Sequence, residues 1–340
     1  MRPLLHIALA VLTVPAIAQT AAPTFTLNDA RALGDTDTAQ FYAGNTSPLW
    51  DAFSDELKAS MKDPAGLQNA QHTIAENYGK ETAVLHESVI LLPPHLYSYT
   101  RIVQYEQSEQ NYLVQWAFSP DGKTIEGFGI HLEPNPAITN FADYKDKTAI
   151  NLPVSGAWTV YQGGLLVGDN YHSTQINERF AMDICMLKDG QLYSGDGTKN
   201  EDFYSFGQPV IAPAAGKIVS ADDSYADSDP GKGGDTDPAQ GNSIVIDHGD
   251  GEFSMIGSLK SGSIKVKVGD TVKADEVIAA VGHTGNSPMA HLTYHLQNTS
   301  KWMKGEGLPI QFQHLLVDGK LSTVTPTRGD IIESKAEATK

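Results

Sequence analysis

Side chains that could do chemistry gather in two stretches of this 340-residue chain. The later stretch, residues 291–295, reads His-Leu-Thr-Tyr-His, and the earlier one contains His172 and Asp183. Alternate residues of a strand share a face, so His291, Thr293 and His295 are expected to project to the same side. Imidazole and carboxylate groups bind zinc, and imidazole exchanges protons near neutral pH. Residues of these types could form a metal-dependent site, and the motifs around them decide which are candidates.

The elements that would position them are short strands. From Leu152 onward the chain consists of brief apolar runs separated by Gly and Pro, which predicts an all-β domain. The expected strands are 158–161, 181–187, 209–211, 217–220, 243–247, 253–256, 277–281 and 292–297.

The preceding part of the chain changes from helical to strand periodicity. Two helical stripes are Trp50, Phe53, Leu57 and Met61, followed by Leu67, Ala70, Ile74 and Tyr78. Pro64 separates them and is expected in the first turn of the second helix. Strands are expected at 82–92, 96–106, 111–119 and 124–132. Helices followed by an antiparallel meander predict an α+β domain, with the helices on one face of a curved sheet.

This element order, with Gly127-Phe128-Gly129-Ile130 closing the last strand, resembles the nuclear-transport-factor-2-like domains over residues 25–133. Residues 134–151 contain Pro134 and Pro136 without a clear period, and they are expected to form an interdomain linker. A binding or dimerisation role for the N-terminal domain is one open interpretation.

Residues 1–18 have the pattern of a secretory signal peptide. Arg2 precedes an apolar run from Leu4 to Val14, and small residues precede the expected cleavage site. The apolar run is too short for a transmembrane helix, and no later stretch is long enough. The mature protein is therefore expected to be exported, to the periplasm or the medium.

Charge and cysteine content exclude several other classes. The formal net charge is −17, and an acidic chain repels phosphate backbones, so nucleic acid is not an expected partner. Cys185 is the single cysteine, which rules out an intramolecular disulfide. Its apolar neighbours indicate a small buried side chain rather than a catalytic thiol.

A series of motifs in the β-rich half resembles the lysostaphin-like (LytM-type) zinc endopeptidases. The matching pieces, in order, are Gln162-Gly163-Gly164, Asn170-Tyr171-His172, Arg179-Phe180-Ala181-Met182-Asp183, Gly195-Asp196-Gly197, Asn200-Glu201-Asp202, Pro209 to Gly216, Gly241 to Gly249, Gly249 to Ser254, Val268 to Val272 and His291. The resemblance covers residues 152–318 and implies a lysostaphin-like peptidase fold, followed by a C-terminal tail at 319–340.

The resemblance implies a zinc ion held by a histidine, an aspartate and a second histidine, with an open position for water. The aspartate ligand maps to Asp183. Members with a short motif place the first histidine where this chain has Arg179, whereas a subgroup carries it further upstream, which fits His172. An exposed histidine without a metal role is the alternative for His172.

Two expected histidines are replaced. The family's His-x-His motif becomes His291-Leu292-Thr293, so His291 is kept as a catalytic residue and Thr293 replaces the zinc ligand. Ser258 stands where the family has a further catalytic histidine. His295 is a possible substitute ligand, but it lies about 6.6 Å further along the strand, so a register slip of two residues would be needed.

The first hypothesis is an exported, catalytically degenerate family member that binds cell-wall peptide or regulates a cell-wall hydrolase. It is supported by the replacement of two expected histidines, by Ser258 and Thr293. The alternative is an active zinc endopeptidase with rearranged ligands, acting on peptidoglycan cross-links. It is supported by the retention of His172, Asp183 and His291. Zinc is expected only if the site is functional, and the oligomeric state stays open.

Overall fold

In this computed structural model the described residues are 25–93, 95–232 and 238–334, and the chain divides into two compact units between Pro134 and Asn135. The expected signal peptide at 1–18 lies outside the described residues. No helix among the described residues combines the length and apolar character needed to cross a membrane. The two units are described separately below.

Four helices open the N-terminal unit: α1 (Leu27–Tyr42), α2 (Thr46–Ala52), α3 (Asp55–Met61) and α4 (Pro64–Asn77). The stripe expected as one helix from Trp50 to Met61 is divided between α2 and α3. The reason is Ser54, whose extended backbone and side-chain oxygen cap the start of α3. Pro64 begins α4 as expected, while α1, with its capping box at Thr26, was not among the expected helices.

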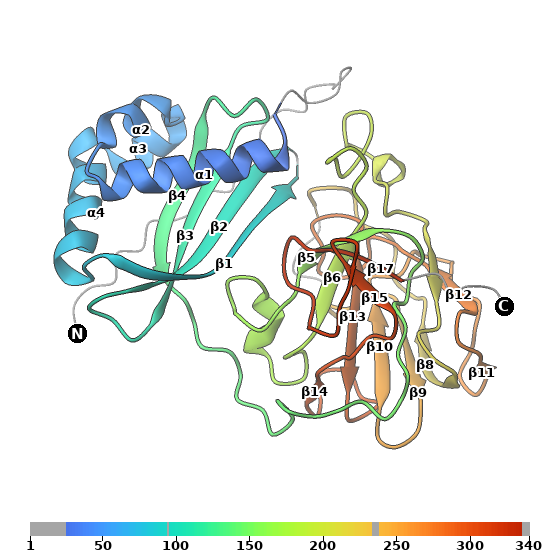
Figure 1. The fold of residues 1–340 in the computed structure, drawn as a ribbon. Coiled ribbons are helices and arrows are strands. Elements are labelled where there is room, and N and C mark those ends of the chain that lie inside the picture. Colours follow the sequence, from blue (N-terminus) through green and yellow to red (C-terminus); the bar gives the residue numbers. More distant parts are fainter. Residues whose placement is uncertain (1–24, 94, 233–237, 335–340) are drawn as a thin grey trace. The chain divides into compact units, whose positions relative to one another are not determined.

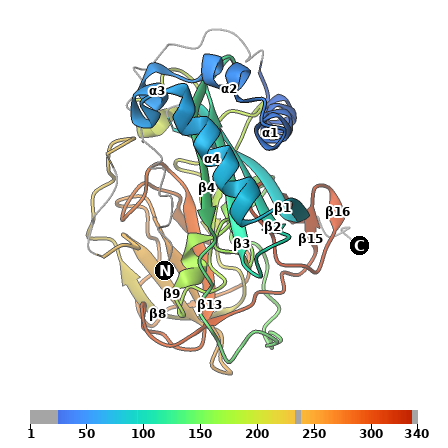
Figure 2. The ribbon, with the colours of Figure 1, turned by 90° about the vertical axis from the view of Figure 1, so that its left-hand side faces the viewer.

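The helices are followed by a four-stranded antiparallel meander in the order β1-β2-β3-β4. The strands are β1 (Glu81–Leu92), β2 (Leu96–Tyr105), β3 (Asn111–Phe118) and β4 (Ile125–Leu132). Each strand begins and ends within one residue of the expected position. Figure 1 shows α1 crossing one face of this sheet, and Figure 2 shows the helices grouped together. A Cβ at Gly34 would lie 2.4 Å from a ring atom of Tyr99, so only glycine permits this approach of α1. The order of the elements, helices followed by a sheet, is the one expected for an α+β domain.

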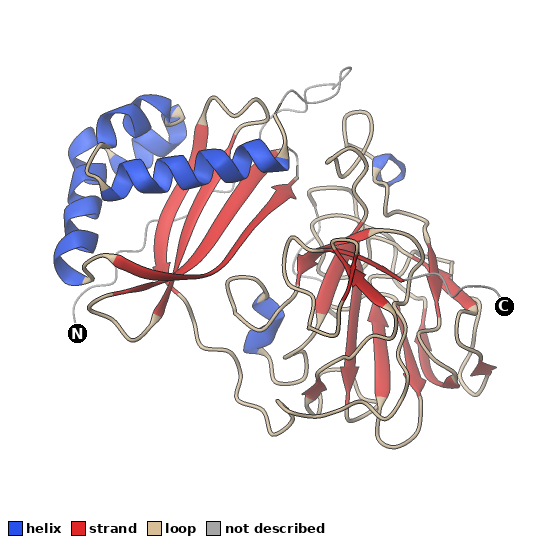
Figure 3. Cartoon of the chain, viewed as in Figure 1, coloured by secondary structure: helices blue, strands red, loops and turns tan. Residues whose placement is uncertain are grey.

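The C-terminal unit is built from strands, with only two short 3-10 helices among its described residues (Figure 3). The strands are β5 (Trp158–Gln162), β6 (Met182–Cys185), β7 (Pro209–Ile211), β8 (Gly216–Asp222), β9 (Ser243–Asp247), β10 (Phe253–Gly257), β11 (Thr271–Val272), β12 (Val277–Ala280), β13 (Leu292–Gln297), β14 (Gly307–Leu308), β15 (Leu315–Val317), β16 (Lys320–Leu321) and β17 (Ile331–Ser334). The 3-10 helices are η1 (Tyr171–Thr174) and η2 (Asn200–Asp202). The main sheet has the order β11-β8-β9-β10-β13-β6-β5-β17-β15-β16, β14 pairs with β13, and β12 pairs with β7.

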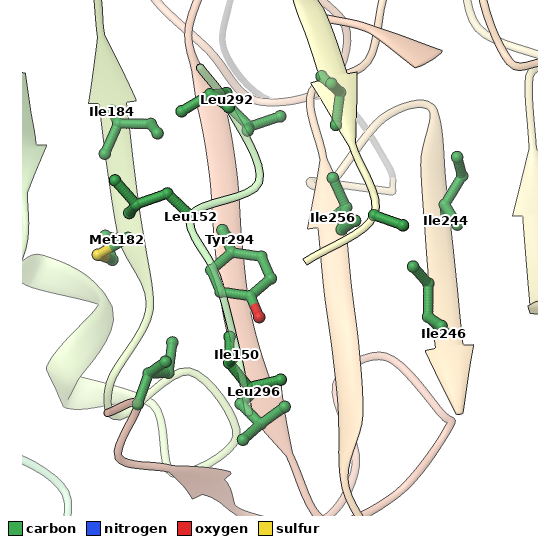
Figure 4. Packing of buried hydrophobic residues seen from close by; sticks show 14 of the residues in the cluster. Ile150, Leu152, Met182, Ile184, Ile244, Ile246, Ile256, Leu292, Tyr294 and Leu296 are labelled. Carbon is green, nitrogen blue, oxygen red and sulfur yellow. The ribbon is translucent and has the colours of Figure 1, made fainter. Parts of the chain in front are cut away.

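Strand β13 separates an apolar face from a polar one. Leu292, Tyr294 and Leu296 are fully buried in the hydrophobic core, beside residues of β6, β10 and β9 (Figure 4). Because side chains alternate along a strand, Thr293 and His295 project from the opposite face. The core therefore fixes the direction of the candidate site residues. Cys185 is also buried, and burial raises the pKa of its thiol to about 12.

The segment expected as a linker, residues 134–151, is bonded along much of its length to the C-terminal unit. Glu306 accepts hydrogen bonds from the side chain and backbone around Thr139 and Asn140 at 2.8–3.0 Å. Glu252 accepts from the backbone N–H groups of Lys147 and Thr148 at 2.7 and 2.8 Å. The boundary between compact units thus falls before this segment, after Pro134.

Most of the segment expected as a C-terminal tail, residues 319–334, continues the same sheet. Strand β17 pairs with β15 and with β5, where Ile332 lies opposite Trp158. The backbone N–H of Val160 donates to the carbonyl of Asp330 at 2.9 Å. Residues 335–340 lie outside the described part of the chain.

Candidate active site

The candidate residues meet where three neighbouring strands run side by side. In the antiparallel pairing of β6 with β13, Asp183 lies directly opposite Thr293. On the other side of β13, Gly257 of β10 is the partner of Thr293. Opposite residues in adjacent strands are close enough for their side chains to interact. The register therefore brings the Thr293 hydroxyl to the Asp183 carboxylate.

Asp183 is a buried carboxylate with four polar neighbours. Thr293 Oγ1 donates to Oδ1 at 2.8 Å, and His291 Nε2 lies 3.5 Å from the same oxygen. His172 Nε2 lies 3.0 Å from Oδ2, and the Tyr171 hydroxyl donates to Oδ2 at 3.5 Å. The residue is 2% exposed, so these side chains take the place of water around the carboxylate.

His172 is held between two carboxylates. Its Nε2 faces Asp183, and its Nδ1 lies 2.9 Å from Oε2 of Glu178. Burial opposes the charged imidazolium, but the charges and hydrogen bonds of Asp183 and Glu178 prevail and raise the pKa of His172 to about 10. Burial likewise opposes ionisation of Asp183, yet the two histidines hold its pKa well below the usual range. The cluster is thus a charged chain of carboxylate, imidazolium and carboxylate.

His291 approaches the cluster from the start of β13. Its Nδ1 lies 3.0 Å from the backbone carbonyl of Met289 and 2.8 Å from the Ser287 hydroxyl. A carbonyl only accepts, so Nδ1 carries a hydrogen and Nε2 points to Thr293 Oγ1, 3.2 Å away. The Thr293 hydroxyl has one hydrogen, and the shorter contact assigns it to Asp183.

The two other positions where the family motif was expected behave differently. Ser258 follows β10 with a positive φ of 59°, and its hydroxyl lies 3.4 Å from that of Thr293. It borders the cluster but does not contact Asp183 through any recorded hydrogen bond among the described residues. Arg179 donates from Nε to the carbonyl of Ala137 at 3.2 Å, so it anchors the segment before the domain.

His295 lies outside the hydrogen-bonded cluster. It is fully buried opposite Met255, and neither ring nitrogen has a hydrogen-bond partner of good geometry in the described part of the chain. Its ring centroid lies 5.1 Å from that of Trp302. Burial lowers the pKa of His295 to about 4, so the imidazole is neutral. The observed register places Thr293, and not His295, opposite Asp183.

The donor set does not fit the zinc site that the motifs imply. A zinc site of this type needs three nitrogen, sulfur or carboxylate ligands. Here the third position, opposite Asp183, is a hydroxyl, which is a weak zinc ligand and already donates to the carboxylate. Within 25–93, 95–232 and 238–334, no group of three or more His, Cys, Asp or Glu side chains is arranged to hold a metal.

Comparison with known families gives a match over residues 199–305 to peptidase family M23. These residues form an M23 peptidase domain. The match includes Ser258, His291 and Thr293, whereas His172 and Asp183 precede it. The lysostaphin-like resemblance inferred from the motifs is therefore confirmed for this region, as is the M23 fold of the C-terminal unit.

Solved structures of M23 proteins are also similar to this chain. One is a mutant catalytic domain of the prophage-encoded M23 protein EnpA from Enterococcus faecalis, at 17% identity, 47% coverage of this chain, 95% of that chain and a TM-score of 0.30. Another is the catalytic domain of the antimicrobial peptidase lysostaphin from Staphylococcus simulans, at 24% identity, 43% and 84% coverage and a TM-score of 0.26. Comparison with curated proteins gives no match.

Sequence reasoning missed two members of the cluster, Tyr171 and Glu178. Tyr171 is stacked on His172, with ring centroids 4.1 Å apart, and is 53% exposed. Glu178 binds the far side of His172. The available signal was the position of both residues: Tyr171 lies within a motif piece, and Glu178 directly precedes one.

Proposed function

We propose that the C-terminal unit is a catalytically degenerate M23 domain of an exported protein, which binds cell-wall peptide or regulates a cell-wall hydrolase. The observation that carries this proposal is the Thr293 hydroxyl opposite Asp183, donating at 2.8 Å where the family places a zinc ligand. Ser258 in place of the further histidine supports it, because a serine hydroxyl does not exchange protons near pH 7 as imidazole does.

The surface of the cluster offers a contact for a peptide. Asp183, His172 and His291 are each less than 9% exposed, whereas half of Tyr171 is accessible to solvent. Its hydroxyl reaches Asp183 while its ring remains open to a ligand. An aromatic side chain with a polar tip suits a peptide-binding surface, because the ring packs against apolar groups. We therefore assign Tyr171 to ligand contact.

The test is co-sedimentation of the purified chain with cross-linked peptidoglycan, run beside a dye-release assay for cleavage. We expect binding without dye release. Tyr171→Ala should weaken binding, whereas Leu321→Ala, another exposed apolar residue, serves as the matched control and should not. Absence of binding by the folded wild-type chain would contradict the proposal.

The second candidate is an active zinc endopeptidase with rearranged ligands. It is favoured by one observation, the convergence of His172 and His291 ring nitrogens on Asp183 at 3.0 and 3.5 Å. In this case dye release should occur, and it should be abolished in the Asp183→Ala variant. That result would replace the degenerate assignment.

A further inference from the structure

The polar neighbours of Asp183 occupy both of its oxygens. Oδ1 faces Thr293 and His291, and Oδ2 faces His172 and Tyr171. A buried carboxylate with several donors is satisfied without a cation, because each donor replaces part of the lost hydration. The donors come from η1 and from β13 with its preceding residue, so the cluster joins elements that are distant in sequence.

Thr293 is the residue of the cluster whose hydrogen bond is incompatible with a metal bound to Asp183. A cation bound beside Oδ1 would compete with the Thr293 hydroxyl for that oxygen, and the hydroxyl would offer only a weak ligand in return. The alternative imidazole on the same face, His295, interacts electrostatically with Glu178 but makes no recorded hydrogen bond to the cluster within the described residues. The local donor set therefore favours the metal-free arrangement.

We propose that Thr293 turns the Asp183 cluster from a metal-binding site into a metal-excluding hydrogen-bond centre that holds η1 and β13 together. This inference rests on the proposed degenerate function. It adds that the domain does not respond to metals. The fold of the C-terminal unit and its binding of ligand are independent of zinc, because protein hydrogen bonds do what a structural metal would do.

The test is thermal unfolding of the full chain with zinc chloride alone, with EDTA and with neither. The wild type should give one unchanged midpoint in all three conditions. Thr293→Ser keeps the hydroxyl and should behave like the wild type, whereas Thr293→Val removes the donor at nearly constant volume and should unfold a few degrees lower.

Thr293→His supplies the missing ligand type. Its midpoint should rise by about 5 °C or more when zinc exceeds its dissociation constant about 100-fold, and EDTA should reverse the rise. A zinc-dependent midpoint in the wild type would overturn the proposal. So would equal midpoints for Thr293→Val and Thr293→Ser, which decides the matter even if Thr293→His does not fold.

The outcome is separable from the proposed function. Peptidoglycan binding is measured by co-sedimentation, and zinc dependence by unfolding. A chain that ignores zinc but fails to bind peptidoglycan contradicts only the function. A chain that binds peptidoglycan only with zinc contradicts only the metal-excluding centre.

Discussion

Two buried carboxylates of the C-terminal unit, Asp183 and Glu252, are satisfied by different kinds of donor. Asp183 is surrounded by side chains: two imidazoles and two hydroxyls. Glu252, which is fully buried, receives two backbone N–H groups and the Tyr144 hydroxyl at 2.7–2.8 Å. In both, burial opposes the charge and the donors outweigh it, so the pKa of each lies below its usual value.

The two carboxylates differ in how easily a substitution removes their donors. Backbone N–H groups do not titrate and are present in nearly every residue, so Glu252 holds positions 147 and 148 whatever their identities, proline excepted. Side-chain donors can each be removed by one substitution, because their hydrogen bonds depend on residue type. We infer that the Asp183 cluster can change function while the Glu252 cluster preserves the fold.

The largest effect is expected from Glu252→Ala. It removes the acceptor of three part-buried hydrogen bonds, donated by Lys147, Thr148 and Tyr144 to a charged group, which should lower the free energy of unfolding by roughly 3–5 kcal/mol. Urea unfolding followed by tryptophan fluorescence measures the loss. Glu276→Ala is the control, since exposed Glu276 accepts one backbone hydrogen bond that water can replace. Similar losses in the two variants would refute the structural role of Glu252.

A smaller loss is expected from Asp183→Asn, at roughly 2–3 kcal/mol. The amide is similar in size but lacks the charge that pairs with His172, and leaving a buried charge with fewer partners is destabilising. Tyr171 and Thr293 should keep their positions, so the far-ultraviolet spectrum should not change. An unchanged urea midpoint would show that the carboxylate charge does not hold the cluster together.

The smallest effect, of opposite sign, is expected from Asp37→Asn in the N-terminal unit. Asp37 is buried, accepts only a 3.4 Å bond from Gln40 among the recorded contacts, and burial raises its pKa to about 6. A raised pKa means that its contribution to stability is full below about pH 4 and is lost as pH rises through about 6. Asparagine does not ionise and so avoids the loss of stability at high pH. The variant should therefore be more stable than the wild type by about 1 kcal/mol at pH 8.

Thermal unfolding at pH 8 and pH 4 measures this difference, and it should vanish at the lower pH. Asp51→Asn, on the exposed surface of α2, should show no such change. A destabilised Asp37→Asn variant at pH 8 would mean that the donors around Asp37 outweigh its burial, as they do around Asp183.

Local patterns were sufficient to predict most of the fold. The strand-like periodicity of β1 to β4 and the turn residues between them predicted the N-terminal sheet, although consecutive residues of β2 are buried on both faces. The stripe through Trp50 and Met61 was misleading, because helical spacing continues across Ser54 although the chain extends there to cap α3. Strand β17, Ile331–Ser334, was missed because it lies in the segment after residue 318 that was expected to be a tail.

The site was predictable where residue type carries the information. His172, Asp183, His291 and Thr293 were named from motifs, and the structure brings all four together. Glu178 could not be assigned, because its role depends on the turn that returns η1 to β6. That His295 makes no hydrogen bond to the cluster also required the structure, since it depends on the register that places Thr293 opposite Asp183.

The pairing of β5 with β17 has a consequence for how the C-terminal unit folds. Trp158 and Ile332 are partners although about 170 residues separate them, so closing the sheet there requires a large loss of chain entropy. Pairings of such high contact order form slowly. We therefore expect this edge of β5 to pair late, so that in the meantime its free backbone groups are open to aggregation or to capture by a chaperone.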